Sequence, residues 1–446
     1  MHAVFDRVES EVRSYCRSFP AVFETARGCF LYDEQGQEYL DFFAGAGTMN
    51  YGHNNPRIKE AVIDYLRRDG VAHSLDMWTV AKRGFLDAFE GVILKPRGLP
   101  YKVQFTGPTG ANAVEAALKL ARKVTGRGNI ISFTNGYHGL SAGALAITGN
   151  RHFRNEAFVA RLDATFMPYD GYLGEQVNTL DYLRRLLVDK SSGLDLPAAV
   201  ILETIQAEGG INVARYEWLR GLEKLCREFD ILLIVDDIQV GNGRTGTFFS
   251  FELAGIKPDM VVLSKAIGGL GLPMSLLLIN PAVDQWKPAE HTGTFRGNNL
   301  AFVAATAALQ YWRDGDFSDE IMRKGKMLAA RLSGLRKKHP QQVKAIRGRG
   351  LIWGMEMASP ELAKAVSRGA FARKLIIELA GAEDQVVKFL PPLIIEDAAL
   401  NHGLEIIEEI VGAATNTKPR SKRVGKSRGL PNNRNHRLAM AGAPKA

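Results

Sequence analysis

The stretch that decides the fold is ILLIVDDIQVGNGRTG at residues 231–246, followed by MVVLSKAIGG at residues 260–269. Each piece starts with a short, uncharged run rich in β-branched residues. The first run ends in a pair of aspartates, and the second ends next to Lys265. Short apolar runs bounded by polar or glycine-rich residues are typical of strands buried on both faces of a sheet. The stretch therefore predicts two buried strands with charged residues at their carboxyl ends.

Runs of the same kind recur between residues 100 and 280, and amphipathic stretches separate several of them. The further runs are YKVQF (101–105), NIISF (129–133), AAVILE (198–203) and SLLLI (275–279). Helical spacing of apolar residues is found in AVEAALKLARKV (113–124) and YEWLRGLEKLCREF (216–229). Buried strands that alternate with helices predict an α/β fold, with a mostly parallel central sheet and helices on both of its faces.

The chain after residue 310 has a different pattern. VKAIRGRGLIWGMEM (343–357) alternates like strands with one exposed face, and a helix is expected to follow with Ser359 as N-cap and Pro360 in its first turn. This pattern predicts a smaller α+β domain. The expected division is an N-terminal segment contributing to the small domain (1–55), a large α/β domain (56–310), a small C-terminal α+β domain (311–413) and a basic, disordered tail (414–446).

The charge distribution argues against a nucleic-acid-binding body. The chain has a formal net charge of +9, from 57 basic and 48 acidic residues. Nine of the basic residues and no acidic one lie in residues 414–446, so the preceding chain is neutral. A basic tail rich in Gly, Pro and Asn is more often a solvated extension than a binding site. Nucleic-acid binding by the tail is therefore a disfavoured alternative.

The cysteines and the hydropathy pattern indicate a cytoplasmic protein. Cys16, Cys29 and Cys226 are far apart, odd in number and form no CxxC pair, so neither a disulfide framework nor a zinc site is expected. The first residues carry charges throughout and lack the apolar core of a signal peptide. No uncharged apolar run is long enough to span a membrane. We therefore expect no metal and no membrane association.

The predicted strand ends offer functional groups that suit one cofactor. Ligands of open parallel sheets bind beyond the carboxyl ends of the strands. Pyridoxal phosphate has an aldehyde that a lysine can hold as a Schiff base and a ring nitrogen that pairs with a carboxylate. Its phosphate suits a helix N-terminus, and its flat ring suits an aromatic side chain. The strand ends supply this set with TGPTGANA (106–113), TNGYHG (134–139), TIQAEGG (204–210), Asp236 and Lys265.

A competing motif lies in the same region. Gly241, Gly243 and Gly246 fit the GxGxxG pattern of dinucleotide-binding folds. That pattern should follow its strand directly and begin a helix. Here it follows DDIQV and runs into TFFSFE, which has no helical pattern. Nicotinamide or flavin binding is therefore disfavoured.

These motifs resemble the class III aminotransferases, a group of fold type I pyridoxal-phosphate enzymes. The resemblance covers residues 30–411 and is carried by VDDIQVGNGRTG (235–246), LSKAIGG (263–269) and GTFRGNN (293–299). It implies that Lys265 is the catalytic residue, which holds the cofactor and moves the proton between the substrate carbon and the cofactor.

The resemblance also implies roles for the other cofactor-binding positions. Around the ring they are Asp236 on the pyridinium nitrogen, Gln239 on the phenolic oxygen, Tyr137 stacked on the ring face, and Glu208 as a gating carboxylate nearby. Around the phosphate they are the backbone of Gly110 and Ala111, and Thr294, which would reach the phosphate of the neighbouring subunit. Because Thr294 would serve the other subunit, the resemblance implies a homodimer with shared active sites. A dimer of dimers is left open.

Within the class, the chain is most similar to the transaminases that form diaminobutyrate for ectoine synthesis. The stretches that carry this likeness are VRSYCRSFPAVF (12–23), YLDFFAGAG (39–47), NYGHNNP (50–56), AHSLDM (72–77), GPTGANAVEAALKLARKVTGR (107–127) and PAAVILETIQAEGGINVARYEWL (197–219). The likeness implies transfer of the amino group of L-glutamate to the aldehyde of L-aspartate 4-semialdehyde, which gives L-2,4-diaminobutyrate and 2-oxoglutarate.

A few positions depart from the class pattern. Many members have an arginine where this chain has Leu140 and Lys388, and those arginines commonly help to bind substrate carboxylates. A lysine lacks the bidentate fork of arginine, so Arg296 and Lys388 are only candidates for gripping glutamate. Asp76 is a candidate for the substrate ammonium, although an ordinary surface or capping role is favoured. Asp237 replaces a more usual glutamate, a change that we expect to be minor.

Other reactions fit the same motifs. Another ω-transaminase, acting on ornithine, putrescine or a natural-product intermediate, is the first alternative. The absence of an arginine at Leu140 argues against a plain ornithine or γ-aminobutyrate enzyme. An aminomutase or racemase on the same scaffold remains open.

Overall fold

The largest sheet has seven strands, and the computed structural model describes it within residues 3–154 and 163–414. In spatial order the strands are β4 (Lys102–Phe105), β12 (Leu276–Ile279), β11 (Met260–Leu263), β10 (Leu232–Asp236), β7 (Ala199–Leu202), β5 (Ile130–Phe133) and β6 (Ala164–Met167). β12 runs antiparallel to both of its neighbours, and the other pairs are parallel. The predicted mostly parallel sheet is confirmed. It also contains the edge strand β6, which the sequence pattern did not predict.

Helices cover both faces of this sheet. α6 (Gly110–Thr125) packs with Ile234 and Val262, whereas α9 (Tyr216–Glu228) packs in a separate core with Leu233 and Val235. Adjacent residues of one strand point to opposite faces, so the two helices lie on opposite sides of β10. The predicted helical stretches therefore bury their apolar faces against the sheet.

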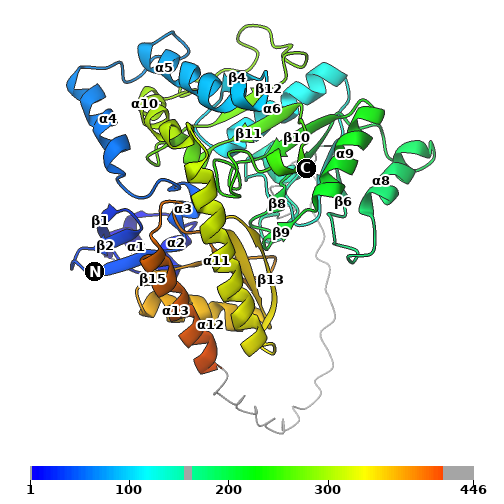
Figure 1. Cartoon of the computed structure of the whole chain (residues 1–446). Helices are drawn as coiled ribbons and strands as arrows, with labels where there is room; N and C mark the ends of the chain where they lie inside the picture. The colour runs from blue at the N-terminus through cyan, green and yellow to red at the C-terminus, as the bar shows by residue number, and fades with distance from the viewer. Residues whose placement is uncertain (1–2, 155–162, 415–446) are drawn as a thin grey trace, which may run out of the picture.

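Two smaller sheets lie apart from the large one (Figure 1). One has the order β13 (Val343–Arg349), β14 (Ile352–Met357), β17 (Val386–Phe389) and β16 (Glu378–Ala380). The other joins β1 (Phe23–Arg27), β2 (Phe30–Asp33) and β3 (Glu38–Asp41) to β15 (Leu375–Ile376). Because β15 pairs with β3, the N-terminal segment and the C-terminal part share one sheet.

The helices of the C-terminal part follow the expected pattern. The chain from residue 299 to residue 338 contains α10 (Asn299–Ala308), the 3-10 turn η5 (Leu309–Trp312) and α11 (Asp316–Lys338). Figure 1 shows α11 running from the large sheet down toward β13. The side chain of Ser359 caps α12 (Pro360–Ala372), as predicted, by accepting a hydrogen bond from the backbone N–H of Leu362.

Among the remaining elements, α13 (Asp397–Ala414) is a long helix that packs against α12. The others are α1 (Ala3–Val8), α2 (Tyr15–Ser18), α3 (Ala44–Gly47), α4 (Pro56–Arg67), α5 (Val80–Ala88), α7 (Ala142–Ala146), α8 (Thr179–Val188), the hairpin strands β8 (Ile205–Gln206) and β9 (Asn212–Val213), the π-helix η1 (Phe89–Leu94), and the 3-10 turns η2 (Lys95–Arg97), η3 (Glu252–Ala254) and η4 (Lys265–Gly268). The GNGRTG motif forms turns after β10 and begins no helix, which is consistent with the rejection of a dinucleotide fingerprint.

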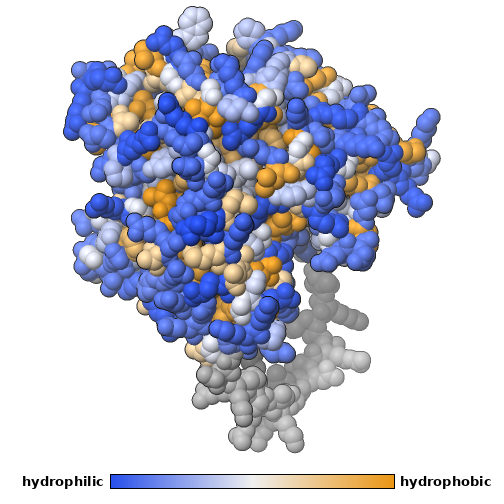
Figure 2. Space-filling model, viewed as in Figure 1, coloured by the Kyte–Doolittle hydropathy of each residue, from blue (hydrophilic) through white to orange (hydrophobic). Residues whose placement is uncertain are grey.

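The surface in Figure 2 is predominantly hydrophilic, with apolar residues in small patches. Within residues 3–154 and 163–414, no helix is both long and apolar enough to cross a membrane. The boundaries of the predicted domains stay predictions, and the basic tail lies outside the described residues.

Candidate active site

Lys265 begins the short turn η4 directly after β11. Its φ of +54° lies in the left-handed region, which non-glycine residues rarely adopt and which is often found at functional sites. Its ammonium group has no hydrogen-bond partner among the residues that the structure describes. Burial lowers the pKa of Lys265, so its neutral amine is more accessible than that of an ordinary lysine.

Asp236 ends the neighbouring parallel strand, β10, and is buried. One carboxylate oxygen lies 2.7 Å from Nδ1 of His138, and the other accepts a hydrogen bond from the backbone N–H of Ile238 at 3.2 Å. Burial alone would lower the pKa of His138, but the bond to Asp236 outweighs it and raises that pKa. The raised pKa of His138 therefore favours its protonated form beside the carboxylate of Asp236.

Tyr137 and Glu203 lie beside this pair. The backbone N–H of Tyr137 donates to Glu203 at 2.9 Å, and its ring packs edge-on against Phe153 with centroids 5.2 Å apart. Burial raises the pKa of Glu203 to about 7. Glu203 thus holds the loop that carries Tyr137 and His138.

The turn before α6 is narrow. A Cβ at Gly107 would lie 2.7 Å from the side-chain oxygen of Asn112, and one at Gly110 would lie 2.6 Å from the side chain of Ile238. Only glycine fits both positions without a shift of neighbouring atoms. Thr109 caps the helix with Asn112 in a capping box. As at any helix start, the first backbone N–H groups, here those of Gly110 and Ala111, have no intrahelical acceptor.

Gln239 links this region to a cluster of charged side chains. Its amide nitrogen donates to the carbonyl oxygen of Ala46 at 2.9 Å and to Glu208 at 3.1 Å. Its side-chain oxygen is buried without a hydrogen-bond partner among the described residues. An unsatisfied buried acceptor is costly, so this atom is suited to a partner that a ligand supplies.

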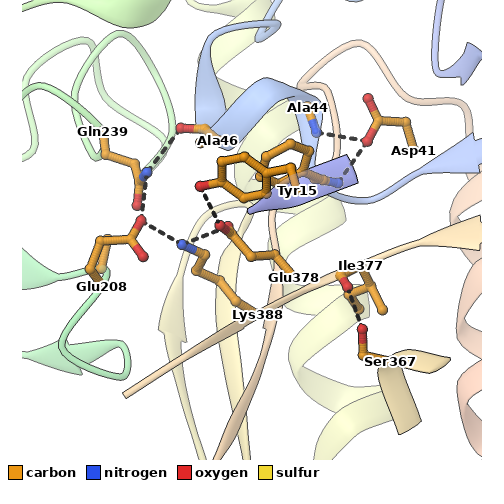
Figure 3. Close-up of polar contacts among 12 residues, drawn as sticks. Tyr15, Asp41, Ala44, Ala46, Glu208, Gln239, Ser367, Ile377, Glu378 and Lys388 are labelled. Atoms are coloured by element: carbon orange, nitrogen blue, oxygen red, sulfur yellow. Dashed lines mark hydrogen bonds and ion pairs between the residues drawn. The ribbon is translucent and has the colours of Figure 1, made fainter. Parts of the chain in front are cut away.

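The charged cluster consists of Lys388, Glu208, Glu378 and Tyr15, and Figure 3 shows it as a connected network. The ammonium of Lys388 lies 2.7 Å from Glu208 and 2.8 Å from Glu378. The hydroxyl of Tyr15 donates to Glu378 at 3.1 Å. Burial disfavours the charged form of Lys388, but the two carboxylates outweigh this effect and raise the pKa of Lys388. Lys388 is therefore held as a cation.

The partners of Lys388 come from different elements. Glu378 on β16 lies directly opposite Lys388 on β17, whereas Glu208 lies on the turn between β8 and β9. Burial opposes ionisation of Glu208, but Lys388 and Lys265 hold the pKa of Glu208 below its usual value. The influence of Lys265 on Glu208 places the cluster and Lys265 in one site.

The segment around Thr294 lies at the surface. His73 donates a hydrogen bond to the carbonyl oxygen of Thr294 at 2.9 Å, and Arg296 forms an ion pair with Asp76. Asp76 is thus engaged by Arg296 within this chain.

The family model described as "Aminotransferase class-III" matches residues 13–411. The chain belongs to the class III aminotransferase family. Among similar curated proteins, the diaminobutyrate–2-oxoglutarate transaminase of Wolinella succinogenes is 61% identical over 92% of this chain and 96% of its own length. The protein of the same name from Bordetella parapertussis is 59% identical over 92% of this chain and 95% of its own.

Solved structures show the same fold. The ornithine aminotransferase of Toxoplasma gondii ME49 is 26% identical, with a TM-score of 0.81 over 93% of this chain and 94% of its own. A second structure of a Toxoplasma gondii ornithine aminotransferase has a TM-score of 0.79 at 27% identity over 93% of this chain and 94% of its own. That structure has partial occupancy of pyridoxal phosphate at its active site.

Membership of this family implies a pyridoxal phosphate cofactor, and the residues of this aminotransferase fit one. The lysine with a lowered pKa, the buried carboxylate, the narrow turn at a helix start and the orphaned oxygen of Gln239 supply one partner for each polar part of the cofactor.

The structure brings most of the residues predicted from the sequence together. Asp236 and Lys265 end adjacent strands, and Gln239 contacts Glu208. Thr294 is exposed in the single chain, and its predicted role toward a second subunit stays a prediction. Sequence reasoning missed His138, Glu203, Tyr15 and Glu378. Glu378 and Lys388 each interrupt an apolar run, LIIEL (375–379) and VVKF (386–389), and a charge inside such a run signals a buried pair.

Proposed function

We propose that this aminotransferase moves the amino group of L-glutamate to the aldehyde of L-aspartate 4-semialdehyde, which gives L-2,4-diaminobutyrate and 2-oxoglutarate. The observation that carries the proposal is the identity of 61% over 92% of the chain to a protein named for this reaction. A place in ectoine synthesis is part of the same proposal.

The chemistry at Lys265 follows from its surroundings. Bound pyridoxal phosphate supplies an aldehyde that links to amines and a ring that takes up an electron pair. Burial favours the neutral amine of Lys265, which is the form able to bond to a carbonyl carbon or accept a proton. In the proposal the amine of Lys265 would hold the cofactor and would then carry the proton that leaves the substrate carbon.

Asp236 and Gln239 act on the ring. The carboxylate of Asp236 keeps the ring nitrogen protonated, and His138 positions that carboxylate through its 2.7 Å bond. The amide of Gln239 hydrogen-bonds the phenolic oxygen. Tyr137 stacks on the ring face, held by the bond of its backbone to Glu203. Each group thereby favours the ring in the orientation in which it takes up electrons.

The start of α6 and a residue of a neighbouring subunit would hold the phosphate of the cofactor. The backbone N–H groups of Gly110 and Ala111 point out of a helix N-terminus, where the helix dipole favours an anion. Thr294 reaches the phosphate of the neighbouring subunit, which makes the protein a homodimer with shared active sites. Exposed apolar side chains at Trp78 and Phe295 support an interface near this segment.

A cytoplasmic location is also proposed. Cys16, Cys29 and Cys226 are unpaired, as is usual in a reducing compartment.

The test is a substrate panel with purified protein. L-Glutamate is supplied as donor with aspartate 4-semialdehyde, and formation of 2-oxoglutarate and diaminobutyrate is measured. Ornithine and putrescine, each with 2-oxoglutarate, serve as competing pairs. The proposal predicts the highest kcat/KM for the aspartate semialdehyde pair. Preference for ornithine or putrescine would assign the chain to another ω-transaminase, and turnover without release of 2-oxoglutarate would indicate an aminomutase or racemase.

A further inference from the structure

The cluster around Lys388 has one cation for two carboxylates. Lys388 lies within 2.8 Å of both Glu208 and Glu378, so it can offset only one of their charges. Burial raises the pKa of Glu378, although Lys388 opposes this effect. Glu378 is therefore a carboxylate whose ionised form lacks a full counter-charge, and a further cation would stabilise it.

Both carboxylates are more exposed than Lys388, although Glu378 is itself buried. The side chain of Lys388 is 0% exposed, whereas those of Glu378 and Glu208 are 9% and 24% exposed. A ligand that enters the site meets the carboxylates before it meets the ammonium of Lys388. This order disfavours Lys388 as the group that grips a substrate carboxylate and favours recognition of a cation.

Glu378 is also fixed in place. Glu378 lies opposite Lys388 in the antiparallel pair of β16 and β17. One of its oxygens accepts the hydroxyl of Tyr15, and the other lies on Lys388, as Figure 3 shows. A carboxylate oxygen can accept more than one hydrogen bond, so the oxygen that accepts from Tyr15 can take a further donor, whereas the oxygen beside Lys388 is fully enclosed.

The charge of Glu378 is felt at Lys265, since it works against the lowering of the lysine's pKa by burial. Glu378 therefore lies within electrostatic reach of the reacting centre. The substrates of the proposed reaction differ in the charged groups that lie at a distance from the reacting atom. Diaminobutyrate and aspartate 4-semialdehyde react at the γ-position and keep an α-ammonium group, whereas glutamate reacts at its only amine and keeps two carboxylates.

We infer that Glu378, oriented by Tyr15, binds the α-ammonium group of diaminobutyrate and aspartate 4-semialdehyde and so distinguishes them from glutamate. This inference rests on the proposed function. Asp76, the candidate from the sequence, is engaged by Arg296, and Glu378 takes its place as the ammonium partner. A transamination has two half-reactions, one for each pair of amine and carbonyl substrates. Glu378 is thus a specificity-determining residue for the half-reaction of diaminobutyrate and aspartate 4-semialdehyde.

The test compares the two half-reactions of Glu378→Gln. Rapid mixing of cofactor-loaded protein with either diaminobutyrate or glutamate follows the visible absorbance of the cofactor and separates the apparent dissociation constant from the rate. Loss of a charged hydrogen bond should reduce kcat/KM for diaminobutyrate by about 10- to 100-fold, mainly through KM. The kcat/KM for glutamate should change by less than about threefold. Tyr15→Phe should give a smaller loss with the same selectivity.

A matched control and a binding readout complete the experiment. Glu383→Gln removes an exposed carboxylate from the turn between β16 and β17 and should leave both half-reactions unchanged. Calorimetry should show weaker binding of homoserine, in which a hydroxyl replaces the reacting amine, to Glu378→Gln than to the unmodified protein. Binding of glutarate, a dicarboxylate without an amine, should be equal in both.

The outcomes separate the inference from the proposed function. Equal losses for both substrates, or no loss for diaminobutyrate, would overturn the role of Glu378. If the unmodified protein gave no half-reaction with diaminobutyrate at all, the proposed function would fall first, and the ligand assigned to Glu378 would fall with it.

Discussion

Lys265 and Lys388, the two lysines of the site, have opposite surroundings. Lys265 follows a strand of the large sheet, and burial lowers its pKa. Lys388 lies on a strand of a smaller sheet between two carboxylates, which raise its pKa. A neutral amine can bond to an aldehyde and accept a proton, whereas a paired ammonium can do neither. The comparison teaches that surroundings, rather than burial alone, separate a reactive lysine from one that holds carboxylates in place.

The largest expected effect is that of Lys265→Ala. The amine of Lys265 is proposed to accept and then donate the transferred proton. Without it, turnover should fall by about 10,000-fold. The assay is 2-oxoglutarate formation from glutamate. Lys257→Ala, which removes an exposed lysine just before β11, should keep full activity. Activity in Lys265→Ala near that of the control would contradict the role of Lys265.

Lys388→Met should act on stability instead. It leaves the buried carboxylate of Glu378 and the partly exposed carboxylate of Glu208 without their cation, and the free energy of unfolding should fall by about 3 kcal/mol. Urea unfolding measures the change. Lys344→Met, on the exposed side of β13, should cost far less. Adding Glu378→Gln to Lys388→Met should recover part of the loss, and a failure to recover any would argue against the ion pair as its cause.

The neighbouring carboxylates Asp236 and Asp237 provide a third test. In its proposed role Asp236 would keep the ring nitrogen of the cofactor protonated, so Asp236→Asn should lower kcat by about 100-fold. Asp237 is equally buried, but it accepts its hydrogen bond from the backbone N–H of Ser250 at 3.0 Å and does not contact His138. Asp237→Asn should therefore change kcat by less than about threefold. Similar losses in the two variants would show that burial, not position, explains the effect.

The smallest expected effect is a change in the pH dependence of stability. Burial raises the pKa of Asp237 from 3.8 to about 7. Between these values the folded protein keeps a proton that the unfolded chain has released, so this stabilisation is lost as the pH rises toward 7. Asp237 alone should lower the free energy of unfolding by about 1 kcal/mol per pH unit in this window.

Urea unfolding at pH 5 and pH 7 measures this slope. Asp237→Asn should reduce it without abolishing it, because the pKa of Glu203 is also raised to about 7. An unchanged slope in Asp237→Asn would show that Asp237 is ionised across the whole window.

The same comparison explains how much could be predicted from the sequence. The Lys265 side of the site is built from strand ends that follow one another along the chain, so strand patterns placed Asp236 and Lys265 together, and the family resemblance added Gln239. The Lys388 side joins distant segments, since Tyr15 and Glu378 are separated by 363 positions. Pairing across that distance depends on how β15, β16 and β17 meet the N-terminal segment, and no local pattern encodes it. His138 was missed because its contact with Asp236 depends on the loop after β5.

The central claim is that Lys265, and not Lys388, holds the cofactor. Reduction of the cofactor-loaded protein with borohydride fixes the cofactor to the lysine that carries it, and peptide mass spectrometry then locates it. The account predicts a pyridoxyl group on the peptide that contains Lys265 and none on the peptide that contains Lys388. A label on Lys388, or on no lysine, would contradict it.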